Sequence, residues 1–451
     1  MSEPFDAIVV GGGPAGVMSA YTLAKYGHKV VLVDKKSHEQ IGNKTCGDAL
    51  DKSSVLMLNQ ALDLPLPQGD EVSDVLDTMT VATEKGKISL EAPGYTVDRH
   101  IFGQRLLHEA EELGVEVIDS APVRGVIIED GYVRGVKYKK GSQDHEVRGK
   151  VVIDCSGTWA AVRRNLPEGF SEGLQREIPD NHIAASYREI IRLKKDHEFP
   201  HEIYLYYDRD IPSPGYIWYF TKGPKRLNVG TGWLKSDNKV IKGSMKQIFK
   251  DALHKVYSPE DYEVEVTGGG QIPIRPPFDC LTFNGGMVVG DAGCLVDPTT
   301  AEGHGPALMG GYYAGLTVSE ALAKGDVSRE GLWGYNSLVM GHFGARHAMS
   351  YVVLKYLRKI GPKGIETIIA RQFLTEEELT AIFMGKEVSF GLGAIIKKMI
   401  RIFPHWSLPL VLRKMVDEVI AMRDHYMTYP SNPEDLAKWR ERRNEILGED
   451  L

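Results

Sequence analysis

Short apolar runs separated by a helical stretch dominate the start of the chain. Residues 5–10 and 28–33 are almost continuously apolar, as expected of parallel strands that helices cover on both faces. Residues 17–26, between these runs, have the apolar spacing of a helix. Three later runs resemble the first two: 115–118, 151–154 and 286–289. This alternation of strand and helix predicts an α/β fold with a parallel sheet.

The middle and the end of the chain follow different patterns. Residues 126–149 alternate around turn signals, which predicts a β-meander or a pair of hairpins. Residues 181–271 are rich in Tyr, Ile, Val and Trp in short runs broken by Pro and Gly, as in an antiparallel sheet. Residues 305–324 predict a helix, and residues 327–451 have a mostly helical pattern. The sheet segment interrupts the α/β elements, so we expect interleaved domains.

The first predicted strand leads into a glycine loop with the spacing Gly-x-Gly-x-x-Gly. Gly11 permits the tight turn, Gly13 lets the backbone approach a pyrophosphate, and Gly16 allows the helix to pack closely on the strand. Pro14 and Ala15 open the helix, whose N-terminal amide groups attract phosphate. Strand, loop, helix and second strand occur in the order of a dinucleotide-binding unit. We therefore expect all five residues to contact a dinucleotide cofactor.

The kind of dinucleotide follows from the acid that ends the second strand and from two later segments. Asp34, followed by Lys35, is placed to bind a ribose hydroxyl group, which favours FAD or NAD over NADP. Residues 151–157 and the segment around Gly290-Asp291 resemble nucleotide-contacting elements of glutathione-reductase-type flavoproteins, which implies that Gly290 and Asp291 contact FAD. The sequence has no second Gly-x-Gly-x-x-Gly for a separate NAD(P)H domain. FAD is therefore the predicted cofactor.

Further motifs resemble the geranylgeranyl reductase family, and the resemblance extends over essentially the whole chain. They are Cys46-Gly47-Asp48, residues 213–220, Gly290-Asp291 and residues 298–305. Residues 213–220 resemble the family's Pro-x-x-Tyr-x-Trp-x-Phe-Pro substrate signature, although Thr221 replaces the last proline, and residues 300–305 are less glycine-rich than the family's turn. The resemblance implies a fold similar to glutathione reductase and p-hydroxybenzoate hydroxylase. It also implies an FAD-dependent reductase that saturates the isoprenoid double bonds of geranylgeranyl chains in archaeal ether lipid biosynthesis.

The same resemblance assigns further contacts with the cofactor. It implies that Cys46, Gly47 and Asp48 approach FAD and that Gly303 and His304 lie near the flavin ring. From its residue type alone, Cys46 has three interpretations: a buried small residue, a redox-active thiol, or a group that shapes the flavin site.

Aromatic residues recur at alternate positions along two predicted strands of the middle sheet. Because side chains alternate between the faces of a strand, we expect one face to present Tyr204, Tyr206, Tyr216, Trp218 and Phe220. Such a face suits a long polyene, since it offers apolar area and π-faces that tolerate positive charge. Without the family resemblance, sheet core is the better interpretation. The candidate catalytic residues are Cys46, Tyr206, Tyr216 and Trp218, and the candidate proton donors are Cys46, Tyr206, His304 and water.

Composition and charge narrow the range of possible binding partners and cellular settings. The net charge of −7 at pH 7 offers no basic field for nucleic acid. Four widely spaced cysteines without a Cys-x-x-Cys pair predict neither a disulfide scaffold nor a metal site, and indicate a reducing setting. No apolar run approaches the ~18 residues that span a bilayer, so we expect a cytoplasmic protein. The basic amphipathic residues 391–422 are a candidate for peripheral membrane contact.

Two features leave alternatives open. Arg99 and Arg105 lie at the start of a predicted helix, and each is either a pyrophosphate contact or a surface arginine. Electrons must reach the flavin through an open face or from a protein, so NAD(P)H and reduced ferredoxin are both candidate donors.

Other functions are compatible with the same cofactor. Aromatic hydroxylases usually carry Asp-Gly and a histidine where this chain has Asp154-Cys155 and Cys294. Flavin-dependent halogenases carry Trp-x-Trp-x-Ile-Pro, in which Tyr216 would replace the first Trp. A flavin-bearing carrier or membrane-binding protein without chemistry is a third alternative.

Three units are expected along the chain. Residues 1–75, 100–165 and 275–326 would form a discontinuous, Rossmann-like FAD-binding domain. Residues 76–99 and 166–274 would form an interleaved antiparallel-sheet substrate domain, and residues 327–451 a helical C-terminal domain.

Overall fold

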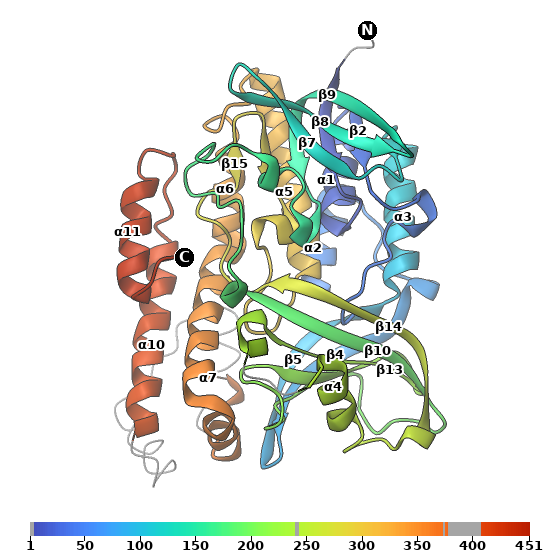
Figure 1. The fold of residues 1–451 in the computed structure, drawn as a ribbon, viewed down its shortest axis with the longest axis vertical. Helices are drawn as coiled ribbons and strands as arrows, with labels where there is room; N and C mark the ends of the chain where they lie inside the picture. The colour runs from blue at the N-terminus through green and yellow to red at the C-terminus, as the bar shows by residue number, and fades with distance from the viewer. Residues whose placement is uncertain (1–3, 240–242, 373–374, 378–406) are drawn as a thin grey trace.

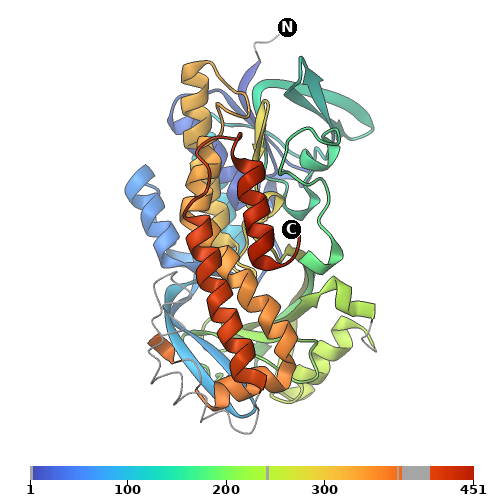
Figure 2. The same cartoon turned by 90° about the vertical axis from the view of Figure 1, so that its left-hand side faces the viewer.

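The computed structural model describes residues 4–239, 243–372, 375–377 and 407–451. This part of the chain contains two eight-stranded sheets, with the first in the upper half of Figure 1 and the second in the lower half. Long C-terminal helices stand along one side of the molecule (Figures 1 and 2). The architecture confirms the predicted α/β class with an additional helical C-terminal region.

The first sheet has the strand order β15-β16-β9-β1-β2-β6. The strands from β16 to β6 are parallel, β15 pairs with β16 in antiparallel orientation, and β8 and β7 extend β9 as an antiparallel ribbon. Its strands are β1 (Phe5–Val10), β2 (Val30–Val33), β6 (Glu116–Ile118), β7 (Val123–Glu129), β8 (Tyr132–Lys140), β9 (Gln143–Asp154), β15 (Thr282–Phe283) and β16 (Gly286–Val288). Central β1 pairs in parallel with both β2 and β9, as its apolar run predicts. The predicted meander over residues 126–149 is confirmed.

Helices α1 (Pro14–Lys25), α3 (Arg99–Glu112) and α5 (His304–Lys324) cover this sheet. Helices α1 and α5 approach so closely that a Cβ on Gly311 would lie 2.4 Å from the carbonyl oxygen of Ala15. Only glycine permits this approach, and it brings the N-terminal ends of both helices to the same edge of the sheet. The cofactor residues predicted from distant parts of the sequence therefore become neighbours.

The second sheet has the order β14-β10-β13-β12-β11-β4-β5-β3. Its strands are β3 (Ala49–Asp51), β4 (Val72–Thr83), β5 (Gly86–Val97), β10 (Ile183–Leu193), β11 (Glu202–Tyr206), β12 (Tyr216–Thr221), β13 (Arg226–Leu234) and β14 (Tyr262–Pro273). All neighbouring pairs are antiparallel except β11 and β4, which are parallel. The sheet includes β3 and begins β4 at Val72, so it extends further toward the N-terminus than the predicted boundary between residues 75 and 76.

One face of the second sheet packs against α4 (Met245–Leu253), where Phe249 and Leu253 are buried with Tyr219 and Val229. The other face turns toward the first sheet and toward the connection that carries α2 (Lys52–Leu62). This second face is the one that borders the candidate site.

The described C-terminal region consists of α6 (Gly334–Val339), a π-helical turn (Met340–Gly344), α7 (Ala345–Ala370), α10 (Ser407–Tyr426) and α11 (Leu436–Leu447). Figure 2 shows α10 and α11 side by side next to α7. Residues 391–406 of the predicted amphipathic segment lie outside the described residues. The later part forms α10, whose Leu412, Met415 and Val419 are buried against α7. Within the described ranges, no helix is long and apolar enough to cross a membrane.

Candidate functional site

The glycine loop has the close contacts that its spacing predicts. Gly11 adopts φ +102°, and a Cβ on it would lie 2.5 Å from the carbonyl oxygen of Cys155. A Cβ on Gly16 would lie 1.8 Å from the carbonyl oxygen of Gly11, so strand and helix could not pack with a larger residue. At Gly13, no atom of the described chain lies within 4 Å of the corresponding Cβ position. The loop therefore presents open backbone at the start of α1.

The N-terminus of α1 has free hydrogen-bonding capacity for an anion. Gly13 is the N-cap and provides no side-chain acceptor, and Pro14 occupies the first turn. The adjacent Asp34 accepts hydrogen bonds from the amides of Gly12 at 2.5 Å and Lys36 at 2.7 Å. Each carboxylate oxygen keeps a lone pair for a ribose hydroxyl group. The neighbouring Lys35 ammonium lies 5.9 Å from the ring centroid of Trp159.

A second helix N-terminus lies beside the loop. Gly290 adopts φ +63°, and its Cβ position lies 3.1 Å from the Cβ of Ala15. Asp291 forms an ion pair of 2.9 Å with Lys44. Gly303 is the N-cap of α5 and offers no side-chain cap. His304, the first residue of the helix, is buried, and its Nδ1 has no partner among the described residues. Burial lowers the pKa of His304 well below its usual value, so its imidazole is neutral.

These features fit FAD. The open glycine loop and uncapped α1 N-terminus would hold the pyrophosphate, and Asp34 would hold a ribose. The segment Gly290-Asp291 and the start of α5 lie next to this loop, where they would contact the remaining part of the cofactor. The four elements come from two distant parts of the sequence, and the close packing of α1 on α5 brings these parts together.

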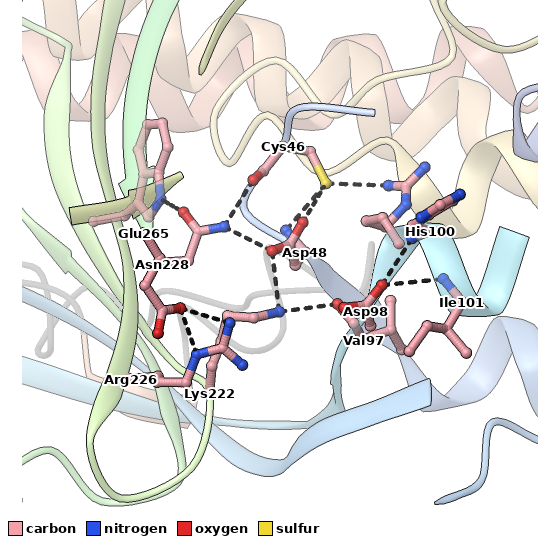
Figure 3. Close-up of polar contacts among 12 residues, drawn as sticks. Cys46, Asp48, Val97, Asp98, His100, Ile101, Lys222, Arg226, Asn228 and Glu265 are labelled. Atoms are coloured by element: carbon pink, nitrogen blue, oxygen red, sulfur yellow. Dashed lines mark hydrogen bonds and ion pairs between the residues drawn. The ribbon is translucent and has the colours of Figure 1, made fainter. Parts of the chain in front are cut away.

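Cys46 lies in a polar network at the end of the connection before β3 (Figure 3). Its Sγ accepts hydrogen bonds from Arg99 Nη1 and from the Asp48 amide, both at 3.1 Å, and donates to Asp48 Oδ1 at 3.2 Å. Asp48 adopts φ +72°, which folds its carboxylate back onto the thiol. Burial raises the pKa of the Cys46 thiol, and Arg99 opposes this shift. At neutral pH Cys46 is therefore a thiol that carries its proton.

Two buried side chains from the second sheet complete this network. Lys222 Nζ donates to Asp48 Oδ2 and to the Val97 carbonyl, each at 3.1 Å. Asn228 Nδ2 donates to Asp48 Oδ2 at 2.9 Å and to the Cys46 carbonyl at 2.8 Å. Asn228 Oδ1 in turn accepts from the Trp218 indole at 3.1 Å. The loop holding Cys46 is thus fixed to the aromatic strand β12, and sequence reasoning missed both Lys222 and Asn228.

The aromatic face differs from the prediction at Tyr204 and Tyr206. Strand β11 pairs Tyr206 with Ile217 and Tyr204 with Tyr219, so both β11 tyrosines lie on the face covered by α4. This register places Tyr204 and Tyr206 on the face opposite to that of Trp218, so the expectation of one shared face is wrong for both tyrosines.

The remaining aromatic residues of the predicted face, all on β12, do share the face that borders the Cys46 loop. The ring pairs Tyr216–Trp218 and Trp218–Phe220 lie 6.4 Å and 6.2 Å apart, and a Cβ on Gly47 would lie 2.5 Å from the Phe220 ring. Tyr207 extends the row, with its ring 5.7 Å from that of Tyr216. Burial raises the pKa of Tyr216, whose hydroxyl donates to the Thr300 carbonyl at 2.7 Å.

The two candidate arginines have different partners in the structure. Arg99, the first residue of α3, contacts Cys46 as described above. Arg105 instead forms ion pairs with Glu71 and, at 2.7 Å, with Glu109. The charge of Arg105 is thus matched by two carboxylates of the protein itself.

Comparisons with known proteins agree with this geometry. A family model described as an FAD binding domain matches residues 5–337. The digeranylgeranylglycerophospholipid reductase of Sulfolobus acidocaldarius is 29% identical, over 99% of this chain and 98% of that protein. A protein of the same name from Methanoculleus marisnigri is 30% identical, over 75% of this chain and 82% of its own length.

A solved structure extends this similarity to the fold. A geranylgeranyl bacteriochlorophyll reductase-like protein from Thermoplasma acidophilum aligns with a TM-score of 0.75 and 25% identity, covering 92% of this chain and 99% of that one. The chain belongs to the digeranylgeranylglycerophospholipid reductase family of FAD-binding proteins.

Proposed function

We propose that this protein is an FAD-dependent reductase that saturates the isoprenoid double bonds of geranylgeranyl chains in a membrane ether phospholipid. The observation that carries the proposal is the juxtaposition of three features: the open dinucleotide loop, the protonated Cys46 thiol and the aromatic row Tyr216-Trp218-Phe220.

The reaction determines what the protein must supply. An isolated trisubstituted double bond is not electrophilic, so hydride addition to one carbon requires a proton at the other. FAD, once reduced by two electrons, supplies the hydride. The chain's own residues must exclude water, position the alkene and deliver the proton.

The aromatic row suits the first two tasks. Tyr216, Trp218 and Phe220 form a continuous apolar strip on one strand, and the ring faces tolerate the positive charge that develops on a protonated alkene. The Trp218–Asn228 hydrogen bond fixes the indole, so the strip is rigid next to the Cys46 loop. We assign these residues to substrate positioning.

Cys46 is the proposed proton donor. Its thiol remains protonated at neutral pH because burial raises its pKa, and its Sγ is held by Arg99 and Asp48. Tyr206 is removed from the candidates because it lies on the opposite face of the sheet. His304 is neutral and buried at the start of α5, where it supports the cofactor side of the site.

The proposal also covers the electron donor and a peripheral contact with the membrane. The single Gly-x-Gly-x-x-Gly loop favours direct reduction through an open flavin face by NAD(P)H or by reduced ferredoxin. Comparing turnover with each donor decides between them. Sedimentation with anionic vesicles tests peripheral membrane contact.

A catalytic assay tests the proposed activity. The FAD-loaded protein, a chemical reductant and a geranylgeranyl ether phospholipid are incubated without oxygen, and the lipid is examined by mass spectrometry. The proposal predicts a gain of one hydrogen molecule for each double bond reduced, and a large loss of product with Cys46→Ala but not with the distant Cys280→Ala. An unchanged lipid mass despite a fully reduced flavin would contradict it.

A further inference from the structure

One cation on the site-facing side of the second sheet has no anionic partner among the described residues. The strand register aligns Trp218 of β12, Gly230 of β13, Arg188 of β10 and Gly268 of β14 in a single row across the sheet. Residues paired in this way point to the same face. Arg188 therefore lies on the face that carries the aromatic row, beyond Trp218 in the direction of the sheet edge.

Arg188 is buried and unpaired. Its side chain belongs to a residue that is 7% exposed, and its Nε and Nη1 are buried without a hydrogen-bond partner among the described residues. A guanidinium group stays charged in proteins and cannot relieve burial by losing its proton. A buried cation without a partner is unfavourable, so such a group indicates a missing anion.

Other buried cations show how unusual this is. Each of them has a polar partner that the structure describes: Arg99, Arg163, Lys222, Arg275 and Arg443. The nearest acid along the strand is also engaged elsewhere. Glu189 points to the opposite face, where it accepts from Tyr187 at 2.8 Å and pairs with Lys250 at 2.7 Å. Arg188 is left with its charge toward the site.

Glycines flank Arg188 on both neighbouring strands, and the absence of their side chains lets other groups approach closely. A Cβ on Gly230 would lie 2.6 Å from the Cβ of Arg188 and 2.2 Å from the Trp218 ring. A Cβ on Gly268 would lie 2.6 Å from Thr45 Oγ1, directly before Cys46. Arg188 thus stands between the aromatic row and the loop that holds the proposed proton donor.

The same row reaches solvent at one end. Strand β14 is the edge of the sheet, and Gly269 and Gly270 on it are exposed. Ser186, partly exposed on the same face as Arg188, lies opposite Gly270. An amphiphile lying along this face would place its apolar chain over the aromatic rings and its polar end near Arg188 and the open edge.

We propose that Arg188 binds the phosphate group of the phospholipid substrate, and so sets how far the isoprenoid chain enters the site. This inference rests on the proposed function for the identity of the ligand. A guanidinium group binds phosphate with two parallel, charge-assisted hydrogen bonds, which lysine cannot reproduce. The FAD pyrophosphate is accounted for separately by the α1 N-terminus on the first sheet.

The test compares Arg188→Gln and Arg188→Lys with Arg192→Gln, an exposed arginine of the same strand. Turnover is measured with the geranylgeranyl ether phospholipid and with the corresponding neutral diether alcohol, which lacks phosphate. Arg188→Gln should raise KM for the phospholipid by about tenfold or more and leave KM for the alcohol unchanged. Arg188→Lys should recover part of this loss. Inorganic phosphate should compete with the phospholipid in the wild type but not in Arg188→Gln.

A binding measurement keeps this inference separate from the proposed activity. A fully saturated ether phospholipid has no double bond to reduce, so its effect on tryptophan fluorescence reports binding alone. Wild-type binding that is lost in Arg188→Gln supports the phosphate site even if no alkene is reduced. Loss of FAD from Arg188→Gln, equal effects on phospholipid and alcohol, or unchanged phospholipid affinity would each overturn the assignment.

Discussion

The buried ion pair between Lys222 and Asp48 gives the sharpest test of how the Cys46 loop is held. Lys222→Met keeps the length of the side chain and removes its charge and both hydrogen bonds. The two side chains are 2% and 4% exposed, so Asp48 would be left charged in a site that water scarcely reaches. Removing one partner of a buried pair costs about 3–5 kcal/mol.

The contacts that Asp48 keeps place the expected cost of Lys222→Met near the lower end of that range. The Asp48 carboxylate keeps the Asn228 amide at 2.9 Å and the Cys46 thiol at 3.2 Å as donors. We therefore expect the free energy of unfolding of Lys222→Met to fall by about 3 kcal/mol. Lys225→Met is the matched control, because Lys225 lies at an exposed position 4.0 Å from Asp196. This control should change stability by less than about 0.5 kcal/mol.

Urea titration of the FAD-loaded proteins, followed by tryptophan fluorescence, measures both changes. Removing the second charge should restore stability, because the double variant Asp48→Asn/Lys222→Met no longer buries an unpaired carboxylate. We expect it to be about 1–3 kcal/mol more stable than Lys222→Met alone. The reasoning is refuted if the two substitutions destabilise additively, or if Lys222→Met is as stable as Lys225→Met.

Three further predictions concern the cofactor loop, the aromatic face and the turn before α5. Gly13→Ala should fold normally, since its Cβ position is open in the described chain. In a flavin titration this variant should bind FAD about tenfold or more weakly, and unchanged affinity would contradict the pyrophosphate site. Tyr206→Phe should leave kcat/KM unaltered, whereas Tyr216→Phe should lower it by losing the bond to the Thr300 carbonyl; equal effects would contradict the assigned faces. Burial raises the pKa of Glu302 from 4.5 to about 8, so the folded state retains a proton that the unfolded state releases. Stability should therefore decline as pH rises from about 4.5 to 8, and Glu302→Gln should flatten this slope in thermal unfolding scans; an identical slope would count against a protonated Glu302.

The cofactor-binding half of the fold could be predicted because its signals are local. The apolar run of β1, the spacing of Gly11, Gly13 and Gly16, and the acid at Asp34 all lie within one short segment. Strand and helix bounds in this segment differ from the expected ones by only a few residues. Sterics at Gly11 and Gly16 also require glycine there, as the contact of Gly16 with Gly11 shows.

The substrate face could be predicted only in part because strand register is not local. Tyr206 and Tyr207 are adjacent and chemically alike, and only the pairing of β11 with β12 decides which one lies near Tyr216. Lys222, which directly follows β12, and Asn228 of β13 look like ordinary polar residues in the sequence. Their roles arise from Asp48, which is far away in the sequence and folds back through a positive φ.

The partners of Arg105 could not be predicted for a similar reason. Helical spacing places it near the start of α3 but does not indicate what lies opposite that face. Glu71, in the connection before β4, supplies the partner and neutralises its charge. Arg188 is the opposite case, since it lacks the partner that Arg105 has. Nothing in its sequence surroundings indicates that its guanidinium would be buried without an anion among the described residues.

The most direct test of the central claim is a single turnover without oxygen. The FAD-loaded protein is reduced stoichiometrically, mixed with the geranylgeranyl ether phospholipid, and followed by flavin absorbance and lipid mass in the same sample. We expect the flavin to reoxidise and one double bond to be saturated for each flavin reoxidised. A flavin that stays reduced with this lipid, but reoxidises when air and an aromatic substrate are admitted, would contradict the assignment as a reductase.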